Sequence, residues 1–167
     1  MLNQHNMNLN GFYISKNAIK EKRINEILSW IETLSGDFAG MKIIEFSPKR
    51  VIRFYENVCF RKKIPEKLDH LRSYVTARVF GIDDYNHITL DKLTFGDILR
   101  REEYLNNFLK NTIICIFGGD VCMKYGNKEN TLTSGDMVII MPSVCKVPYS
   151  LSVMNDQIVY AISFREI

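Results

Sequence analysis

Histidine is scarce in this 167-residue sequence, which contains only His5, His70 and His87. Any catalytic or metal site that needs several imidazoles must therefore be built from these three side chains. Long apolar runs are also missing, and none approaches the roughly 18 residues that a membrane-spanning helix needs. The first ten residues, MLNQHNMNLN, are polar and lack the apolar core of a secretion signal. We therefore expect an intracellular protein with no segment embedded in a membrane.

Cysteine pairing motifs are missing as well. Cys59, Cys115, Cys122 and Cys145 form no CxxC pair and no zinc-knuckle spacing. Three of the four lie in apolar runs, where a cysteine usually serves as a small buried hydrophobic residue. We expect no structural disulfide and a reducing compartment. The formal net charge of +3 is too small to indicate a nucleic-acid partner by itself.

What the sequence does contain is the composition of one globular domain. Hydrophobic residues make up 46% and charged residues 25% of the chain, which is typical of a folded protein. The length suits a single hydrophobic core. We predict a flexible amino-terminus over residues 1–9 and one domain over residues 10–167.

Helical patterns dominate the amino-terminal half. Residues 19–34 place apolar side chains on one face of an amphipathic helix, after a polar entry at residues 15–17, and Gly36 is expected to end this helix. A second helix follows Pro65 and buries its Leu68 face, with His70 at the helix surface. Short strands are predicted over residues 11–14, 41–46 and 51–55, the last two as a pair.

Short strands dominate the second half. The alternation and the Gly- and Asp-containing turns predict strands over residues 75–82, 112–117, 121–125, 137–141, 147–153 and 158–164. Asp97 resembles a helix cap, which predicts an inserted helix over residues 98–109. The expected fold class is α+β: a double-stranded β-helix, or jelly roll, buttressed by amino-terminal helices.

Five segments, in this order, resemble motifs of the AlkB family of 2-oxoglutarate- and iron-dependent nucleic-acid dioxygenases. Residues 10–14 (NGFYI) are similar to the opening strand of that family, and residues 50–55 (RVIRFY) to its nucleotide-recognition strand. Residues 64–68 (IPEKL) are similar to a helix start, residues 116–125 (IFGGDVCMKY) to a strand pair, and residues 162–165 (ISFR) to the closing strand. The resemblance implies an AlkB-like jelly roll over residues 10–167.

The resemblance also implies an Fe(II) site of two histidines and one carboxylate. Anchored on the Phe-Gly pair at 95–96, the family's His-x-Asp falls on Thr89 and Asp91, so the carboxylate is present and the imidazole is not. His87, two positions earlier, is an alternative ligand. The second family histidine falls near Ser150, in a stretch without histidine. Thr89, Asp91 and Ser150 are thus predicted to form a vestigial metal site.

The cosubstrate site implied by the resemblance is also degenerate. The arginine that binds 2-oxoglutarate falls on Val159, while the last arginine, Arg165, remains. The family's Asn-x-Tyr falls on Arg78 and Phe80, so the phenol hydroxyl is lost. We predict a pseudoenzyme with no catalytic residue and no cofactor, which serves as an interaction module. One alternative is an active nucleic-acid demethylase that uses Fe(II) and 2-oxoglutarate at an atypical metal site. The other alternative is a cupin-like barrel that binds a small molecule.

Two sets of residues are candidates for partner binding. A basic and aromatic set lies where the family holds its nucleic-acid strand: Lys49, Arg50, Arg53, Tyr55, Arg61, Lys62 and Lys63. Such charges also occur on ordinary solvated strands. The helical insertion, residues 98–110, would present Arg101, Tyr104 and Phe108 to a protein partner or to a second copy, or would instead close a disused active-site mouth. Any nucleic-acid binding is expected to be weak and dependent on salt.

Overall fold

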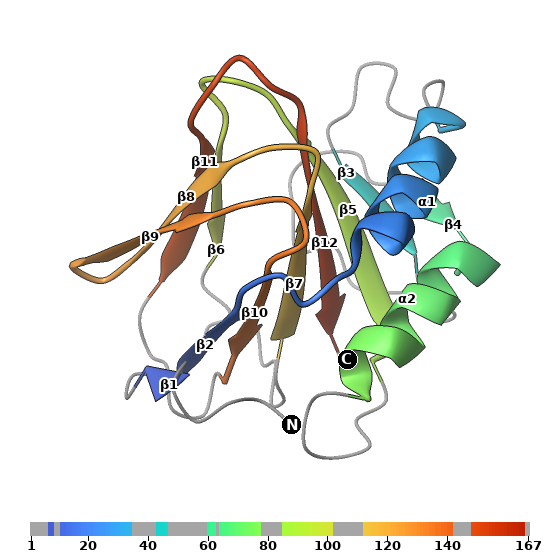
Figure 1. Ribbon diagram of the computed structural model, residues 1–167, viewed down its shortest axis with the longest axis horizontal. Coiled ribbons are helices and arrows are strands. Elements are labelled where there is room, and N and C mark those ends of the chain that lie inside the picture. The colour runs from blue at the N-terminus through green and yellow to red at the C-terminus, as the bar shows by residue number, and fades with distance from the viewer. Residues whose placement is uncertain are drawn as a thin grey trace.

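The computed structural model describes residues 7–8, 11–34, 43–46, 60–62, 64–77, 85–101, 112–141 and 148–165. Within these residues, two β-sheets face each other, and two helices cover the outer face of the larger sheet (Figure 1). Neither helix is long and apolar enough to cross a membrane.

Among the described residues, the larger sheet has eight strands and the smaller sheet has four. The order in the larger sheet is β1 (Met7–Asn8), β2 (Phe12–Ser15), β10 (Met137–Ile140), β7 (Thr112–Phe117), β12 (Val159–Arg165), β5 (His87–Leu93), β3 (Ile43–Phe46) and β4 (Phe60–Lys62). The order in the smaller sheet is β6 (Ile98–Arg101), β11 (Tyr149–Val153), β8 (Val121–Tyr125) and β9 (Lys128–Leu132). The pairings between these described strands are antiparallel except that of β3 with β4. This arrangement is a jelly roll.

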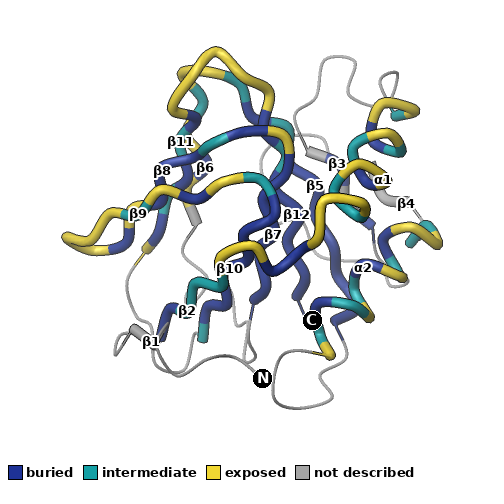
Figure 2. The backbone as a smooth tube through the Cα atoms, viewed as in Figure 1, coloured by how far each residue is buried: buried dark blue, intermediate teal, exposed yellow. Residues whose placement is uncertain are grey.

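Side-chain alternation divides the interior into two hydrophobic clusters. In β12, Ile162 and Phe164 face the helices, whereas Val159 and Ala161 face the smaller sheet. The central strands are therefore buried on both faces, as the dark-blue strands of Figure 2 show. This double burial is the reason why β7, with the sequence TIICIF, is apolar at nearly every position.

Two helices complete the outer cluster: α1 (Glu21–Glu32) and α2 (Glu66–Thr76). The buried residues of α1 are Ile27 and Ile31, which match the predicted apolar face, and α2 buries its Leu68 face as expected. The guanidinium of Arg23 lies 4.2 Å from the ring centroid of Tyr74, which joins the two helices by a cation–π contact. His70 is exposed on α2, as predicted, and its Nε2 lies 3.7 Å from Oε1 of Glu66.

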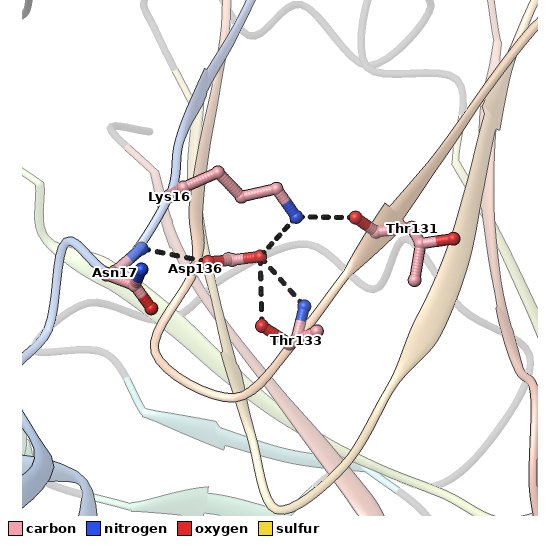
Figure 3. Close-up of polar contacts among 5 residues, drawn as sticks. All are labelled: Lys16, Asn17, Thr131, Thr133 and Asp136. Atoms are coloured by element: carbon pink, nitrogen blue, oxygen red, sulfur yellow. Dashed lines mark hydrogen bonds and ion pairs between the residues drawn. The ribbon is translucent and has the colours of Figure 1, made fainter.

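A buried carboxylate fastens the segment before α1 to the turn before β10 (Figure 3). Asp136 accepts hydrogen bonds from Lys16 Nζ at 2.7 Å and from the backbone N–H of Asn17 at 2.9 Å. The same carboxylate accepts the backbone N–H of Thr133 at 2.8 Å and its hydroxyl at 3.3 Å. Several donors thus compensate for the burial of the negative charge, which is the condition for a stable buried carboxylate. This contact joins residues about 120 positions apart, so no local sequence pattern predicts it.

The helix predicted from residue 98 is wrong at its start, because residues 98–101 form the strand β6. The carboxylate of Asp97 accepts both the N–H and the hydroxyl of Thr94, each at 2.8 Å, so it closes a tight turn rather than capping a helix. Ile98, the first residue of the predicted helix, is 55% exposed. Arg101 is paired in register with Tyr149 instead of lying on a helix surface. Residues 102–110 lie outside the described residues.

Smaller corrections concern the ends of elements. The strand predicted from Val75 is wrong there, since α2 continues to Thr76. The helix predicted over residues 19–34 is shorter at both ends, since α1 begins at Glu21 and ends at Glu32, before Gly36. His87 is the first residue of the strand β5, for which no strand was predicted. The strand β9 was not predicted, because its sequence, KENTL, is mostly polar. The segments 51–55 and 78–82 lie outside the described residues.

Candidate functional site

Polar side chains line one part of the interior, on the two central strands β5 and β12. Thr89 alternates with Ile88 and Leu90, which pack under the helices, so its side chain faces the smaller sheet. The strand register places Arg165 opposite His87 and Ser163 opposite Thr89. The buried polar residues of these strands are His87, Thr89, Asp91, Ser163 and Arg165, each at most 1% exposed. A buried group of this kind is the natural candidate for a functional site.

Hydrogen bonds connect three members of this group. Arg165 Nη1 donates to Thr89 Oγ1 at 3.1 Å, and Thr89 Oγ1 donates to Asp91 Oδ2 at 3.4 Å. The hydroxyl thus links a buried guanidinium to a buried carboxylate. We call Arg165, Thr89 and Asp91 the interior polar chain. In a medium of low dielectric constant, neutralising one charge with the other avoids the large cost of an unpaired buried ion.

The structure brings Thr89 and Asp91 together with Arg165, but it does not bring Ser150 to them. Ser150 lies on β11 in the smaller sheet, between the buried residues Tyr149 and Leu151. Since side chains alternate along a strand, Ser150 lies on the outer face of that sheet, where it is half-buried. The predicted vestigial metal residues are therefore not a single cluster.

Val159 is buried on the interior side of β12, opposite Leu93. It lies six residues before Arg165 on one extended strand, so the two Cα atoms are about 20 Å apart. Val159 and Leu93 both belong to the apolar cluster between the sheets. The position where the resemblance expects a cosubstrate arginine is thus packed with hydrocarbon.

Aromatic side chains fill the interior beside the start of β11, a feature that was not predicted from the sequence. The ring of Phe12 stacks on Tyr125, with centroids 4.1 Å apart, and meets Tyr149 edge-on at 6.2 Å. Asn130 Nδ2 donates to the hydroxyl of Tyr125 at 3.2 Å. All three rings belong to the cluster between the sheets. The only available signal was that each ring lies on the apolar side of an alternating strand.

The described residues do not fit an iron site of two histidines and one carboxylate. His87 and Asp91 lie four residues apart on one strand, so their Cα atoms are about 13 Å apart, whereas metal–ligand bonds are only about 2 Å long. The guanidinium of Arg165, held on Thr89 between them, would repel a dication. In the described part of the chain, no group of three or more His, Cys, Asp or Glu residues is placed to hold a metal ion.

Most of the predicted partner-binding residues lie outside the described residues. Arg61 and Lys62 belong to β4, at one edge of the larger sheet, and Arg101 is the last residue of β6. The remaining partner-binding candidates are not described: Lys49, Arg50, Arg53, Tyr55, Lys63, Tyr104 and Phe108. Arg78 and Phe80, predicted at the cosubstrate site, also lie outside the described residues.

Comparison with known proteins supports the fold. No family model and no curated protein matches this chain. A Pseudomonas putida prolyl-4-hydroxylase superposes with a TM-score of 0.58 at 10% identity, over 94% of this chain and 92% of that one. NgTET1, solved in complex with 5mC DNA, superposes with a TM-score of 0.61 at 7% identity, over 93% of this chain and 71% of that one.

Other similar structures match only part of the chain. Apo-HppE has a TM-score of 0.37 at 15% identity, and the match covers 48% of this chain and 41% of the HppE chain. Two cupin proteins match over 52% and 47% of this chain. At these identities the comparisons show the fold alone, and the predicted jelly roll is confirmed at that level.

Proposed function

We propose that this chain is a pseudoenzyme: a dioxygenase-like jelly roll that has lost iron and 2-oxoglutarate chemistry and serves as a binding module. The observation that carries the proposal is the interior polar chain. Asp91, the one residue that keeps the predicted ligand type, is linked through Thr89 to a buried guanidinium. The buried carboxylate and guanidinium therefore compensate each other, which is a structural role that needs no metal.

The two ends of β12 support the loss of the cosubstrate site. A dicarboxylate needs a cationic partner, but Val159 offers hydrocarbon and is fully buried. Arg165 already donates to Thr89, so an incoming dianion would have to compete for that donor beside the carboxylate of Asp91. Of the two histidines that the structure describes, only His87 is buried.

Iron and cosubstrate binding provide the test. The protein is reconstituted anaerobically with Fe(II) and its iron is measured, and its melting temperature is measured with manganese and millimolar 2-oxoglutarate. A ligand present at 100 times its Kd stabilises the folded state by about 2.7 kcal/mol. For a chain of this length, about 0.35 kcal/mol in the free energy of unfolding corresponds to one degree in Tm, so an occupied site would raise Tm by about 7–8 °C.

We expect substoichiometric iron and no change in Tm. Asp91→Asn supplies the control, because it removes the only carboxylate of the interior polar chain. Stoichiometric iron that this substitution abolishes, or a clear stabilisation by 2-oxoglutarate, would overturn the proposal in favour of the atypical demethylase.

Nucleic acid is the second candidate partner, and the basic residues Arg61 and Lys62 on an edge strand favour it. A fluorescent single strand of 20 nucleotides should bind weakly at low salt and lose most of its affinity at physiological salt. Replacing Arg61, Lys62 and Lys63 with alanine should weaken binding further. An absence of binding at low salt would remove nucleic acid from the candidates.

A further inference from the structure

Exposed apolar side chains gather at one end of the jelly roll. In the part of the chain that the structure describes, the exposed large hydrophobic residues are Phe95 (67% exposed), Ile98 (55%), Met154 (45%) and Ile158 (47%). All four lie in or beside two turns, one joining β5 to β6 and the other joining β11 to β12. Single exposed hydrophobic residues are ordinary, whereas a group of them indicates a contact surface.

The strand register places these two turns side by side. At one end of the turns Leu93 is paired with Val159, and at the other end Ile98 is paired with Ser152. Both turns cross between the sheets, and they run together at the top of Figure 1, where Figure 2 shows them as exposed. A Cβ atom added at Gly96 would meet nothing within 4 Å, so the first turn lies open to solvent. We call Phe95, Ile98, Met154 and Ile158 the two-turn surface.

Hydrogen bonds hold this surface in place before any partner arrives. The carboxylate of Asp97 closes the first turn on Thr94. The second turn is tied to the neighbouring β7–β8 turn, because Asp120 donates its N–H to Gln157 Oε1 at 3.3 Å and accepts from the N–H of Met154 at 3.3 Å. A surface that is already ordered loses little conformational entropy on binding.

The charges within the turns at this surface are acidic, whereas the exposed Arg100 lies two residues beyond Ile98 on β6. Asp97, Asp120 and Asp156 lie in the three adjoining turns, and Asp156 is exposed. Such carboxylates repel phosphate groups and also a symmetric second copy of the same surface. They favour a partner that is apolar at its centre and basic at its edge.

We propose that the two-turn surface binds a protein segment whose apolar side chains are flanked by Lys or Arg. This inference rests on the proposed binding role and gives it a partner class, but it uses the end of β5 opposite to Arg165. The iron assay and the binding assay below can therefore fail separately.

A synthetic peptide of twelve residues, alternating Leu or Phe with Lys and labelled with fluorescein, serves as the probe. Fluorescence anisotropy should show saturable binding that weakens as salt rises. The double variant Phe95→Ser, Ile158→Ser should lower the affinity by about tenfold or more, because it removes the apolar centre. Both side chains are exposed, so Tm should stay unchanged, and Phe95→Leu should retain binding.

A charge pair supplies the matched control. Asp156→Lys should weaken binding of the basic peptide, whereas Glu26→Lys, the same charge change at an exposed position of α1, should leave it unaltered. The proposal is overturned by an absence of saturable binding, by equal binding of a peptide with Glu in place of Lys, or by unchanged affinity in the double variant. Analytical ultracentrifugation that shows a dimer lost in that variant would make a second copy the occupant instead. Binding to neutral phosphatidylcholine vesicles that is lost in the variant would likewise overturn it in favour of a membrane.

Discussion

The substitution Thr89→Val tests whether the interior polar chain is structural. It keeps the shape of the side chain and removes the hydroxyl that accepts from Arg165 and donates to Asp91. A buried hydrogen bond to a charged group contributes about 1.5–3 kcal/mol, and the bond to Asp91, at 3.4 Å, adds little. We expect the free energy of unfolding to fall by about 2–3 kcal/mol, since the guanidinium stays buried without this acceptor.

Thermal and urea unfolding, followed by circular dichroism, measure this change. With about 0.35 kcal/mol per degree for 167 residues, Tm should fall by about 6–9 °C. Thr131→Val on the exposed face of β9 is the matched control, and it should change Tm by no more than about 1–2 °C. A Thr89→Val variant as stable as the wild type would refute the structural role of the interior polar chain and would favour a ligand-binding role for Arg165.

Three further predictions follow from the packing. Asp136→Ala should destabilise by about 2–4 kcal/mol in urea unfolding, because several donors lose their buried acceptor, whereas Lys16→Ala, at a half-exposed partner, should cost less than about 1 kcal/mol. Gly135→Ala should cost about 1–3 kcal/mol by the same measurement, because φ is +95° and a methyl group would lie 2.8 Å from a side chain of α1 and 3.0 Å from a backbone oxygen. Burial raises the pKa of the Cys115 and Cys122 thiols, so both stay protonated near neutral pH. Peptide mass spectrometry at pH 8 should therefore find that iodoacetamide alkylates them more slowly than a free cysteine, and that Cys115 is modified only in denaturant.

Local sequence predicted β7 over residues 112–117, because a continuous apolar run that is buried on both faces leaves few alternatives. The predicted range 121–125 agrees with β8, whose apolar residues Val121, Met123 and Tyr125 alternate toward the interior. Prediction from local sequence failed at β6, because Ile98, Leu105 and Leu109 are spaced like the apolar residues of a helix. The strand forms there because residues 98–101 pair with β11, about 50 residues later in the chain, and that pairing outweighs the local preference.

The candidate site was predictable in part. Alternation along β5 places Thr89 and Asp91 on one face, which the sequence shows directly. The hydrogen bond between Arg165 and Thr89 depends on the register of two strands separated by 76 positions, and no local pattern encodes that register. The two-turn surface was missed for a similar reason, because turns far apart in the chain become neighbours only after the sheets have formed.

The contact between Asp136 and the segment before α1 also bears on the order of events during synthesis. Phe12–Ser15 pairs with Met137–Ile140, and Lys16 and Asn17 bind a carboxylate about 120 residues later. A ribosome that has made β2 must therefore add more than a hundred residues before this strand finds its partner. Contacts of such long range slow folding, and they leave the apolar residues of β2 without their partner strand while the nascent chain grows.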